Sequence, residues 1–341
     1  MSQPQALRQR NRRQVVQALL DHGSLTRPAL ADELGVSKVT AAAIVQELQT
    51  SGWLTLGAGT AGRTGRTAQT VHLASHLGAA LAIDLQNDQI TVHRQSVVSA
   101  DHDLQLVMPG PVATADGALS ALRQGLTPGP FGAVRVVVIS VPAPVDHAGD
   151  IQPPNALNAF DERPLRRAVE EAGAALRFEN DANLVALDYA SRTPWLQNLA
   201  TVIERPSGIG MGLILNGELY RGRTGRAGEF GQIPVASGRA VGRLETLPPS
   251  RRIQATARAL ATLVVGLDLE HLVVNFERGD LLVQTLRQLL EATADGDTPP
   301  LDVSQEPAGT PLLGAAHLSL HLARQRLLTD AMTLGTLTHV A

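Results

Sequence analysis

The 341-residue sequence contains no cysteine and a single lysine, Lys38. Without cysteine the chain can form no disulfide, no thiolate-ligated zinc site and no cysteine nucleophile. Because Lys38 lies near the N-terminus, the remainder of the chain can supply neither the lysine of a Walker A phosphate loop nor the Schiff-base lysine of a pyridoxal phosphate enzyme. Both of these cofactor-binding classes are therefore excluded for the large C-terminal part.

Long apolar runs are absent as well. No run approaches the roughly 18 to 20 residues that a membrane-spanning helix needs, and the arginine-rich N-terminus lacks the apolar centre of a signal peptide. We therefore expect a cytoplasmic protein that does not enter the membrane. With 44% hydrophobic residues the chain can build adequate cores, and its length predicts two or three domains.

Residues 24 to 56 have the pattern of a helix-turn-helix followed by the start of a wing. Apolar residues recur at helical spacing on both sides of Gly35, which supplies the tight turn. Ser37 is the expected N-cap of the second helix, because its hydroxyl can accept a hydrogen bond from a free backbone N–H. The apolar positions are Leu25, Ala29, Leu30 and Leu34 before the turn, and Ala41, Ile44, Val45 and Leu48 after it.

The second helix is the candidate for the DNA major groove. Burial of its apolar face leaves Lys38, Thr40, Ala42 and Ala43 on the outside. The candidate DNA contacts of this helix and its cap are Ser37, Lys38, Thr40 and Ala42. Lys38 can reach a phosphate or a guanine and Thr40 can bond a phosphate, whereas Ala42 offers apolar contact with a thymine methyl group. The alternative is an ordinary helical hairpin without a role in DNA binding.

A glycine-rich segment with two arginines follows, between predicted strands at Trp53 to Leu56 and Thr70 to Leu73. This arrangement predicts a β-wing in which Arg63 and Arg66 can enter a narrow minor groove, where the negative potential is deepest. The alternative is a solvated loop. Residues 1 to 70 carry eight basic and four acidic residues, a net charge of +4, while the rest carries 21 basic and 28 acidic, a net charge of −7. Only the N-terminal part is therefore expected to attract a polyanion.

From Gly78 onward, short β-rich runs alternate with helices, which is typical of an α/β protein. A predicted strand at 176 to 179 delivers Asp181 to the start of the next helix, so we expect this carboxylate to line a cleft. A glycine loop at 207 to 212 follows, and its backbone N–H groups could approach a ligand closely. Glu229 and Glu245 each lie beside glycines further on.

These stretches, in this order, resemble the ROK family of repressors, uncharacterised reading frames and sugar kinases. The matching segments are the N-terminal head, VVISVPAPVDHAGDIQPPNALNAF, ENDANLVALDYA, SGIGMGLILNGELYRG and GRAGEFGQI. The resemblance covers nearly the whole chain and implies an α/β protein with an N-terminal winged helix-turn-helix and a two-lobed, actin-like or RNase H-like sugar-kinase fold. The implied domains are 1–74 for the head, 75–190 for the first lobe and 191–341 for the second, with the helix at about 317–341 packing back on the first lobe.

The resemblance also implies a sugar-binding site. Its residues, matched position by position, are Asn155, Asn180, Asp181, Glu229 and Glu245. Carboxylates and an amide suit a ligand that displays several hydroxyl donors. In the kinases of the family the residue matching Asp181 is the general base for the sugar hydroxyl. Each of these residues could instead serve only in a turn or a helix cap.

The sequence departs from the kinase pattern at the first hairpin. Where the kinases have glycines that admit the phosphates of ATP, this chain has Gln86, Asn87 and Asp88, which add side chains and a negative charge. A later Gly-Gly-Gly turn is replaced by Asn275-Phe276-Glu277. From these departures we expect no ATP binding and no enzymatic activity.

The zinc pattern of the family is also missing. Its positions read Gln232, Ala236, Gly238 and Arg243, so we expect no metal there. His317 and His321 share a helix face, but without a third ligand nearby a solvated face is the expected role.

Together these features predict a cytoplasmic, sugar-responsive DNA-binding regulator that represses carbohydrate-utilisation genes. It would act as a homodimer or a dimer of dimers on palindromic operator DNA, with a sugar effector and no cofactor. One alternative is an active ATP-dependent ROK sugar kinase that carries a DNA-binding head. Another is an architectural DNA-binding protein whose sensor lobes have lost their ligand.

Overall fold

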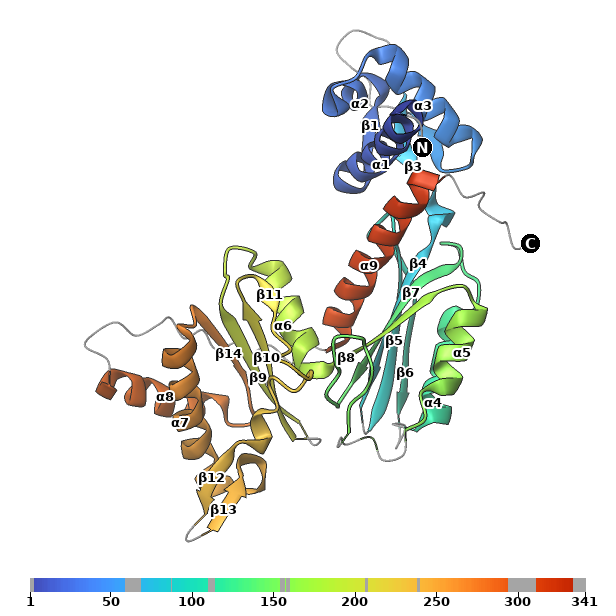
Figure 1. Ribbon diagram of the computed structural model, residues 1–341. Coiled ribbons are helices and arrows are strands. Elements are labelled where there is room, and N and C mark those ends of the chain that lie inside the picture. Colours follow the sequence, from blue (N-terminus) through green and yellow to red (C-terminus); the bar gives the residue numbers. More distant parts are fainter. Residues whose placement is uncertain are drawn as a thin grey trace.

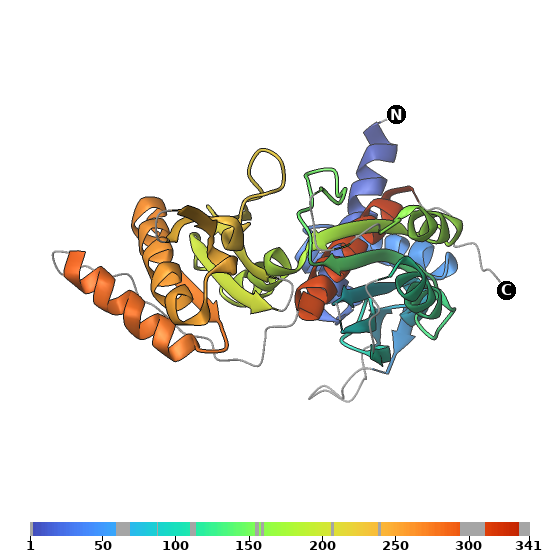
Figure 2. The same cartoon turned by 90° about the horizontal axis from the view of Figure 1, so that it is seen from below.

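The computed structural model describes residues 3–58, 69–86, 88–109, 114–153, 157, 160–205, 208–237, 240–293 and 311–333. Along the chain they form a helical N-terminal part, here called the head (3–58 and 69–73), and two lobes that are each built on a β-sheet (Figure 1). The two lobes lie side by side in both views (Figure 1, Figure 2). The domain boundaries expected at residues 74 and 190 stay predictions.

The head contains three helices and a small antiparallel sheet. The helices are α1 (Gln3–His22), α2 (Arg27–Leu34) and α3 (Lys38–Thr50), and the strands are β1 (Ser24–Thr26), β2 (Leu54–Gly57) and β3 (Thr70–Leu73), in the order β1-β3-β2. Leu25 lies in β1 opposite Val71, so its expected place in a helix was wrong. The reason is local, because Thr26 is the N-cap of α2. Its hydroxyl oxygen accepts a hydrogen bond from Ala29 N at 3.3 Å, and the helix begins at the next residue, Arg27.

The turn between α2 and α3 follows the sequence prediction. Gly35 ends α2 with φ +63°, a left-handed conformation that glycine adopts without strain. The Ser37 hydroxyl oxygen accepts a hydrogen bond from Thr40 N at 3.1 Å and so caps α3. Helix α3 then buries Ala41, Ile44, Val45 and Leu48, as its periodicity predicts. The sequence pattern did not predict α1, whose apolar stripe is weak.

The first lobe holds a five-stranded sheet in the order β6-β5-β4-β7-β8. Its strands are β4 (Ala79–Leu85), β5 (Gln89–Ser96), β6 (His102–Pro109), β7 (Val134–Val141) and β8 (Ala175–Asn180). Strands β4, β7 and β8 are parallel, and β5 and β6 run antiparallel to their neighbours. Helices α4 (Ala115–Leu126) and α5 (Arg163–Glu171) cover one face and α9 (Pro311–Thr333) covers the other (Figure 1), so every residue of β4 is buried.

The second lobe holds a four-stranded sheet in the order β11-β10-β9-β14. Its strands are β9 (Leu199–Arg205), β10 (Gly208–Leu215), β11 (Glu218–Leu219) and β14 (His271–Asn275), and β14 is parallel to β9. Helix α6 (Asp181–Arg192) covers one face, and α7 (Pro249–Leu267) and α8 (Gly279–Thr293) lie on the other (Figure 1). A hairpin of β12 (Pro234–Ser237) and β13 (Ala240–Arg243) extends from this lobe.

The expected glycine loop is mostly a strand, because Gly208, Gly210 and Gly212 lie in β10. A Cβ atom at Gly212 would lie 2.4 Å from the backbone oxygen of Ala182, and one at Gly210 would lie 3.0 Å from the Ala182 Cβ. The glycines therefore allow the first turn of α6 to pack directly on β10. Their role in this structure is close helix packing.

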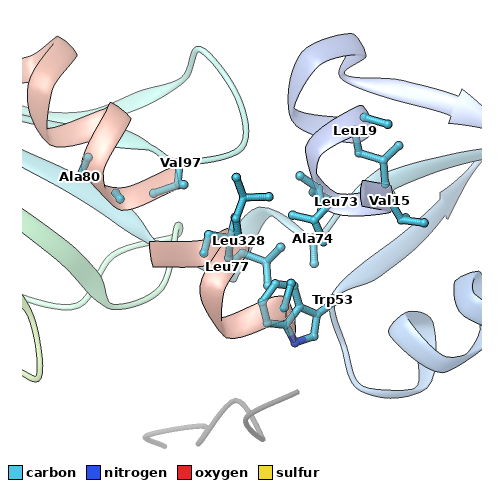
Figure 3. Packing of buried hydrophobic residues seen from close by; sticks show 14 of the residues in the cluster. Val15, Leu19, Trp53, Leu73, Ala74, Leu77, Ala80, Val97 and Leu328 are labelled. Carbon is cyan, nitrogen blue, oxygen red and sulfur yellow. The ribbon is translucent and has the colours of Figure 1, made fainter. Parts of the chain in front are cut away.

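Helix α9 connects the head with both lobes. It packs against α1 of the head, against β4 and β7 of the first lobe, and against α6. A single hydrophobic cluster runs from Val15 and Trp53 in the head through Leu77 and Val97 to Leu328 on α9 (Figure 3). The head is thus docked on the first lobe through a continuous apolar core. No helix within the described ranges, α9 included, is long and apolar enough to span a membrane.

We expect Leu328→Ala to destabilise the head and the first lobe together. Leu328 is 6% exposed, and removing a buried leucine side chain costs about 2 to 5 kcal/mol. Leu313→Ala on the same helix is the control, because Leu313 is 50% exposed and should change stability by less than about 0.5 kcal/mol. The measurement is calorimetric unfolding, and a transition of the head that Leu328→Ala leaves unmoved would contradict a shared core.

Candidate functional site

A cavity of about 250 Å³ lies between the two sheets. Its walls come from the segment after β7, the start of α6, the ends of β9 and β10, and the segments around β13. This volume is at the small end for ligand pockets and suits a monosaccharide better than a larger ligand. Four of the residues expected to bind sugar line it, namely Asn180, Asp181, Glu229 and Glu245, and they are joined by Arg205, Gln232 and Arg243. We refer to this cavity as the cleft.

Asp181 is the most deeply placed acid in the cleft. It is the first residue of α6 and 5% exposed, and its Oδ1 accepts a hydrogen bond from Ala182 N at 2.8 Å. Burial raises the pKa of Asp181 to about 6; the positive charge of Arg205 opposes this rise, while the negative charges of Asp84 and Glu229 add to it. Near neutral pH this carboxylate can therefore take up a proton readily.

Asn180 lines the cleft, but its side chain is already engaged. Its Oδ1 accepts hydrogen bonds from Ala182 N at 3.0 Å and Asn183 N at 3.1 Å, and its Nδ2 donates to Ala143 O at 3.1 Å. This is an N-cap that also ties α6 to the first lobe. Asn180 therefore fixes the position of Asp181 within the cleft.

Glu229 and Glu245 approach the cleft from the second lobe. Burial raises the pKa of Glu229, and the charge of Glu245 adds to this, while the charge of Arg226 and a hydrogen bond from Gln232 oppose it. Gln232 Nε2 donates to Glu229 Oε2 at 2.8 Å. Glu245 lies against backbone, since Cβ atoms at Gly208 and Gly231 would come within 2.9 Å and 2.6 Å of its Oε2. Glycine at these two positions makes room for the carboxylate.

Arg205 was not anticipated from the sequence. It ends β9 with its side chain 17% exposed, and its Nε lies 3.8 Å from Asp181 Oδ2. The charge of Arg205 also acts on Asp84 near the end of β4, where burial raises the pKa of the carboxyl and a hydrogen bond from Gln86 opposes the rise. The charge of one guanidinium thus acts on two aspartates, of which Asp181 lines the cleft.

Asn155 and the positions of the zinc pattern remain to be placed. Asn155 lies outside the described residues, as does Gly238 of the zinc pattern. At the other zinc positions Gln232 bonds Glu229 and Ala236 has no donor atom, so these residues do not fit the metal. Across the described ranges no group of three or more His, Asp or Glu could hold a metal ion. The expected absence of a cofactor stays a prediction.

The side chain of His317 is 46% exposed, as expected for a solvated helix face, and it also makes one contact with α6. His317 Nδ1 lies 2.9 Å from Oδ1 of Asp188, a residue of α6 that is 1% exposed. Burial raises the pKa of Asp188, but the hydrogen bond from His317 and the charges of Arg192 and His317 outweigh it, so the pKa is lowered. This contact joins α6 to α9. His321 instead bonds Gln325 Nε2 at 2.8 Å along the same helix.

On the head, the residues expected to contact DNA lie together at the start of α3. Ser37, Lys38, Thr40 and Ala42 are exposed, and Val39 beside them is 80% exposed. The Thr40 hydroxyl bonds the Ser37 hydroxyl at 2.8 Å, so one of its hydrogen-bonding positions is occupied. Arg63 and Arg66 lie outside the described residues.

Known proteins resemble this chain in sequence and in fold. A curated N-acetyl-D-glucosamine kinase of Haemophilus influenzae (strain 86-028NP) is 34% identical over 108 residues, which make up 31% of this chain and 35% of that protein. A solved ROK family transcriptional regulator, a homolog of the E. coli MLC protein, matches 97% of this chain and 100% of its own with a TM-score of 0.65 and 16% identity. A ROK hexokinase from Thermus thermophilus matches 73% of this chain and 99% of its own, with a TM-score of 0.53 and 23% identity. These structures establish a shared fold, and the chain spans about a third of the length of the curated kinase.

The expectation that the chain is not an enzyme is contradicted by these kinases. It rested on Gln86, Asn87 and Asp88 at the first hairpin and on Asn275-Phe276-Glu277 in place of the later glycine turn. In the structure Gln86 is 8% exposed and its Nε2 donates to Asp84 Oδ1 at 2.8 Å, so the side chain turns back onto β4. Asp88 is exposed to solvent, which screens its charge. Asn87 lies outside the described residues.

We expect Asp181→Asn to stabilise the protein at pH 7.5 and to have little effect below pH 4. Because the folded-state pKa of Asp181 is about 6 and its ordinary value is 3.8, folding becomes less favourable as pH rises through this window. Above pH 6 the ionised Asp181 lowers the free energy of unfolding by at most about 3 kcal/mol. Urea unfolding at both pH values measures the effect.

Asp188→Asn is the control for this comparison, because its pKa is shifted the other way on the same helix. It should lower stability at pH 7.5, with the effect fading as pH falls toward the lowered pKa of Asp188. If Asp181→Asn instead lowers stability at pH 7.5, the favourable charge and hydrogen-bond interactions of the carboxylate outweigh the cost of its burial, which would contradict the raised pKa.

The α/β fold has the architecture of the ROK sugar kinases, with a helical N-terminal region added. Residues 119–243 match the model of the ROK family, and this range includes Asp181, Arg205 and Glu229 of the cleft. The chain contains a ROK family domain.

Proposed function

We propose that the chain is an ATP-dependent sugar kinase, acting on a hexose or an N-acetylhexosamine, that also carries a DNA-binding head. The observation that carries the proposal is the buried Asp181 carboxyl, whose pKa of about 6 suits a general base at neutral pH. The curated N-acetyl-D-glucosamine kinases support the sugar class. The proposal sets aside the expectation that no ATP binds, which is untested.

In the proposed reaction a sugar hydroxyl donates a hydrogen bond to Asp181. Asp181 accepts the proton as the hydroxyl oxygen forms a bond to the γ-phosphorus of ATP, and the bond to the β-phosphate oxygen breaks to release ADP. Glu229 and Glu245 can accept hydrogen bonds from other ring hydroxyls. The hydrogen bond from Gln232 holds Glu229 in position for this role.

We propose a winged helix-turn-helix role for the head, with α3 in the major groove of palindromic DNA and the protein acting as a dimer. The exposed Lys38, the Ser37 cap and the left-handed Gly35 turn support this assignment. The regulator with the same fold over 97% of this chain also supports it. A cytoplasmic location follows from a DNA partner.

A second candidate function is sugar-dependent regulation of transcription. It is favoured by α9, which packs against α6 behind the cleft and against α1 of the head. A change in α6 on ligand binding would therefore reach the head through packed helices, and a small rotation of two paired heads alters their fit to half-sites roughly 34 to 36 Å apart. Kinase activity and regulation can coexist in one chain, and they have separate readouts.

The kinase proposal predicts sugar-dependent release of ADP from ATP and Mg²⁺. Asp181→Asn should lower kcat by at least about 100-fold, because a positioned base contributes roughly that much or more. In the native protein kcat/KM should fall about tenfold per pH unit below pH 6 and level off above it, because the base must be ionised.

Glu218→Gln is the control, since Glu218 is exposed on β11 and does not line the cleft. It should retain the native rate. Absence of ADP release with every hexose and N-acetylhexosamine tested would rule the kinase proposal out and leave sugar-dependent regulation.

The DNA-binding proposal predicts that the protein enriches specific duplexes from a randomised library. Lys38→Ala should weaken binding to the enriched duplex about tenfold and make the log–log salt dependence shallower by about one, because one phosphate contact is lost. Arg258→Ala is the control, since Arg258 is exposed on α7 in the second lobe. Equal loss in both variants, or no enrichment, would contradict the assignment of α3.

A further inference from the structure

Arg205 has more hydrogen-bonding capacity than its surroundings use. Its Nε is buried and has no hydrogen-bond partner in the part of the chain that the structure describes. Its nearest anion, Asp181 Oδ2, lies 3.8 Å from Nε, which is an ion pair but too long for a hydrogen bond. A guanidinium that is 17% exposed is costly to bury without such bonds.

Arg94 is a buried arginine with a purely structural role, and its guanidinium N–H groups are hydrogen-bonded. Arg94 Nε and NH2 donate to the two carboxylate oxygens of Asp103 at 2.8 Å and 2.7 Å, and NH1 donates to Gly125 O at 3.0 Å. Its side chain is 8% exposed, so burial alone does not prevent full bonding. Arg221, whose Nε also lacks a partner, still donates to the buried Glu179. Arg205 differs from both because its side chain lines the cleft.

The charges around Arg205 leave room for a further anion. Burial raises the pKa values of Asp84 and Asp181 even though the positive charge of Arg205 lowers both, and it raises the pKa of Glu229 as well. A carboxyl with a raised pKa can take up a proton when a second negative group arrives. The cleft can therefore lose negative charge on binding while Arg205 keeps its positive charge.

We propose that the cleft binds an acidic sugar, whose phosphate or carboxylate group pairs with the guanidinium of Arg205. The planar fork of arginine matches either group with two parallel hydrogen bonds, whereas the ring hydroxyls would meet Glu229 and Glu245. This inference rests on the proposed function, because it takes the cleft to be a sugar site. A phosphorylated sugar is also what the proposed reaction makes, so the same contact would retain the product beside Asp181.

The test is calorimetric titration of the full-length protein at pH 7.5 with N-acetylglucosamine, N-acetylglucosamine 6-phosphate, glucuronate and inorganic phosphate. We expect one of the two acidic sugars to bind at least tenfold more tightly than the neutral sugar, and which one does so identifies the acidic group. Binding should be accompanied by proton uptake, measured by repeating the titration in buffers of different ionisation enthalpy. Inorganic phosphate alone should bind weakly, since it lacks the ring hydroxyls.

Arg205→Met removes the charge but keeps much of the side-chain length, and it should reduce the preference for the acidic sugar to within about twofold. Arg205→Lys keeps the charge without the fork and should retain part of the preference, which covers the case in which Arg205→Met fails to fold. Arg223→Met is the matched control, because Arg223 is exposed and outside the cleft, and it should keep the full preference.

Two results separate the failure of this inference from that of the proposed function. If the neutral sugar binds as tightly as the acidic sugars, or if Arg205→Met keeps the preference, the role of Arg205 is overturned while the sugar site stands. If no sugar of either kind binds the native protein, the sugar site and the inference fail together.

Discussion

The carboxyl group of Asp181 is buried, and its interactions with Arg205 and the backbone do not offset the cost of burying its charge. The surrounding structure holds it in this position. Asn180 caps α6 and ties its first turn to the first lobe, and the glycines of β10 let that turn lie against the second sheet. The result is an acid with a pKa of about 6 at the junction of two lobes. Such a group makes folding less favourable at neutral pH, which is a cost that binding sites commonly carry and structural acids avoid.

A second constraint is the shared apolar core of the head and the first lobe. Because Val15, Trp53 and Leu328 belong to one cluster, the head has no separate core that would let it move freely on a linker. Helix α9 carries this core and also contacts α6 through His317 and Asp188. In the proposed regulatory role, a change at the start of α6 would reach the head through these packed side chains, in which small shifts produce discrete rearrangements.

Much of this arrangement could be predicted from the sequence, because the relevant signals were local. The turn at Gly35, the Ser37 cap and the buried face of α3 follow from spacing alone. The convergence of Asp181, Glu229 and Glu245 was implied by the resemblance to a known family, and these residues do line one cavity.

The remainder depended on tertiary contacts that leave no local pattern. Arg205 stands between Glu204 and Pro206 in the sequence, and nothing there indicates that its positive charge acts on two aspartates. Gln86 was expected to obstruct the first hairpin, but its hydrogen bond to Asp84 turns it inward. The glycines at 208 to 212 were expected to form a loop and instead make room for α6, since their function is set by a helix that precedes them in the chain.

The ionisation of Asp181 is the central claim, and carbon-13 NMR titration of the aspartate carboxyl groups measures it directly, with Asp181→Asn used to assign the resonance. The account predicts a midpoint near pH 6 in the free protein. A midpoint near the ordinary value of 3.8 would show that the carboxylate is well solvated or fully paired, and the account of the cleft would then be wrong.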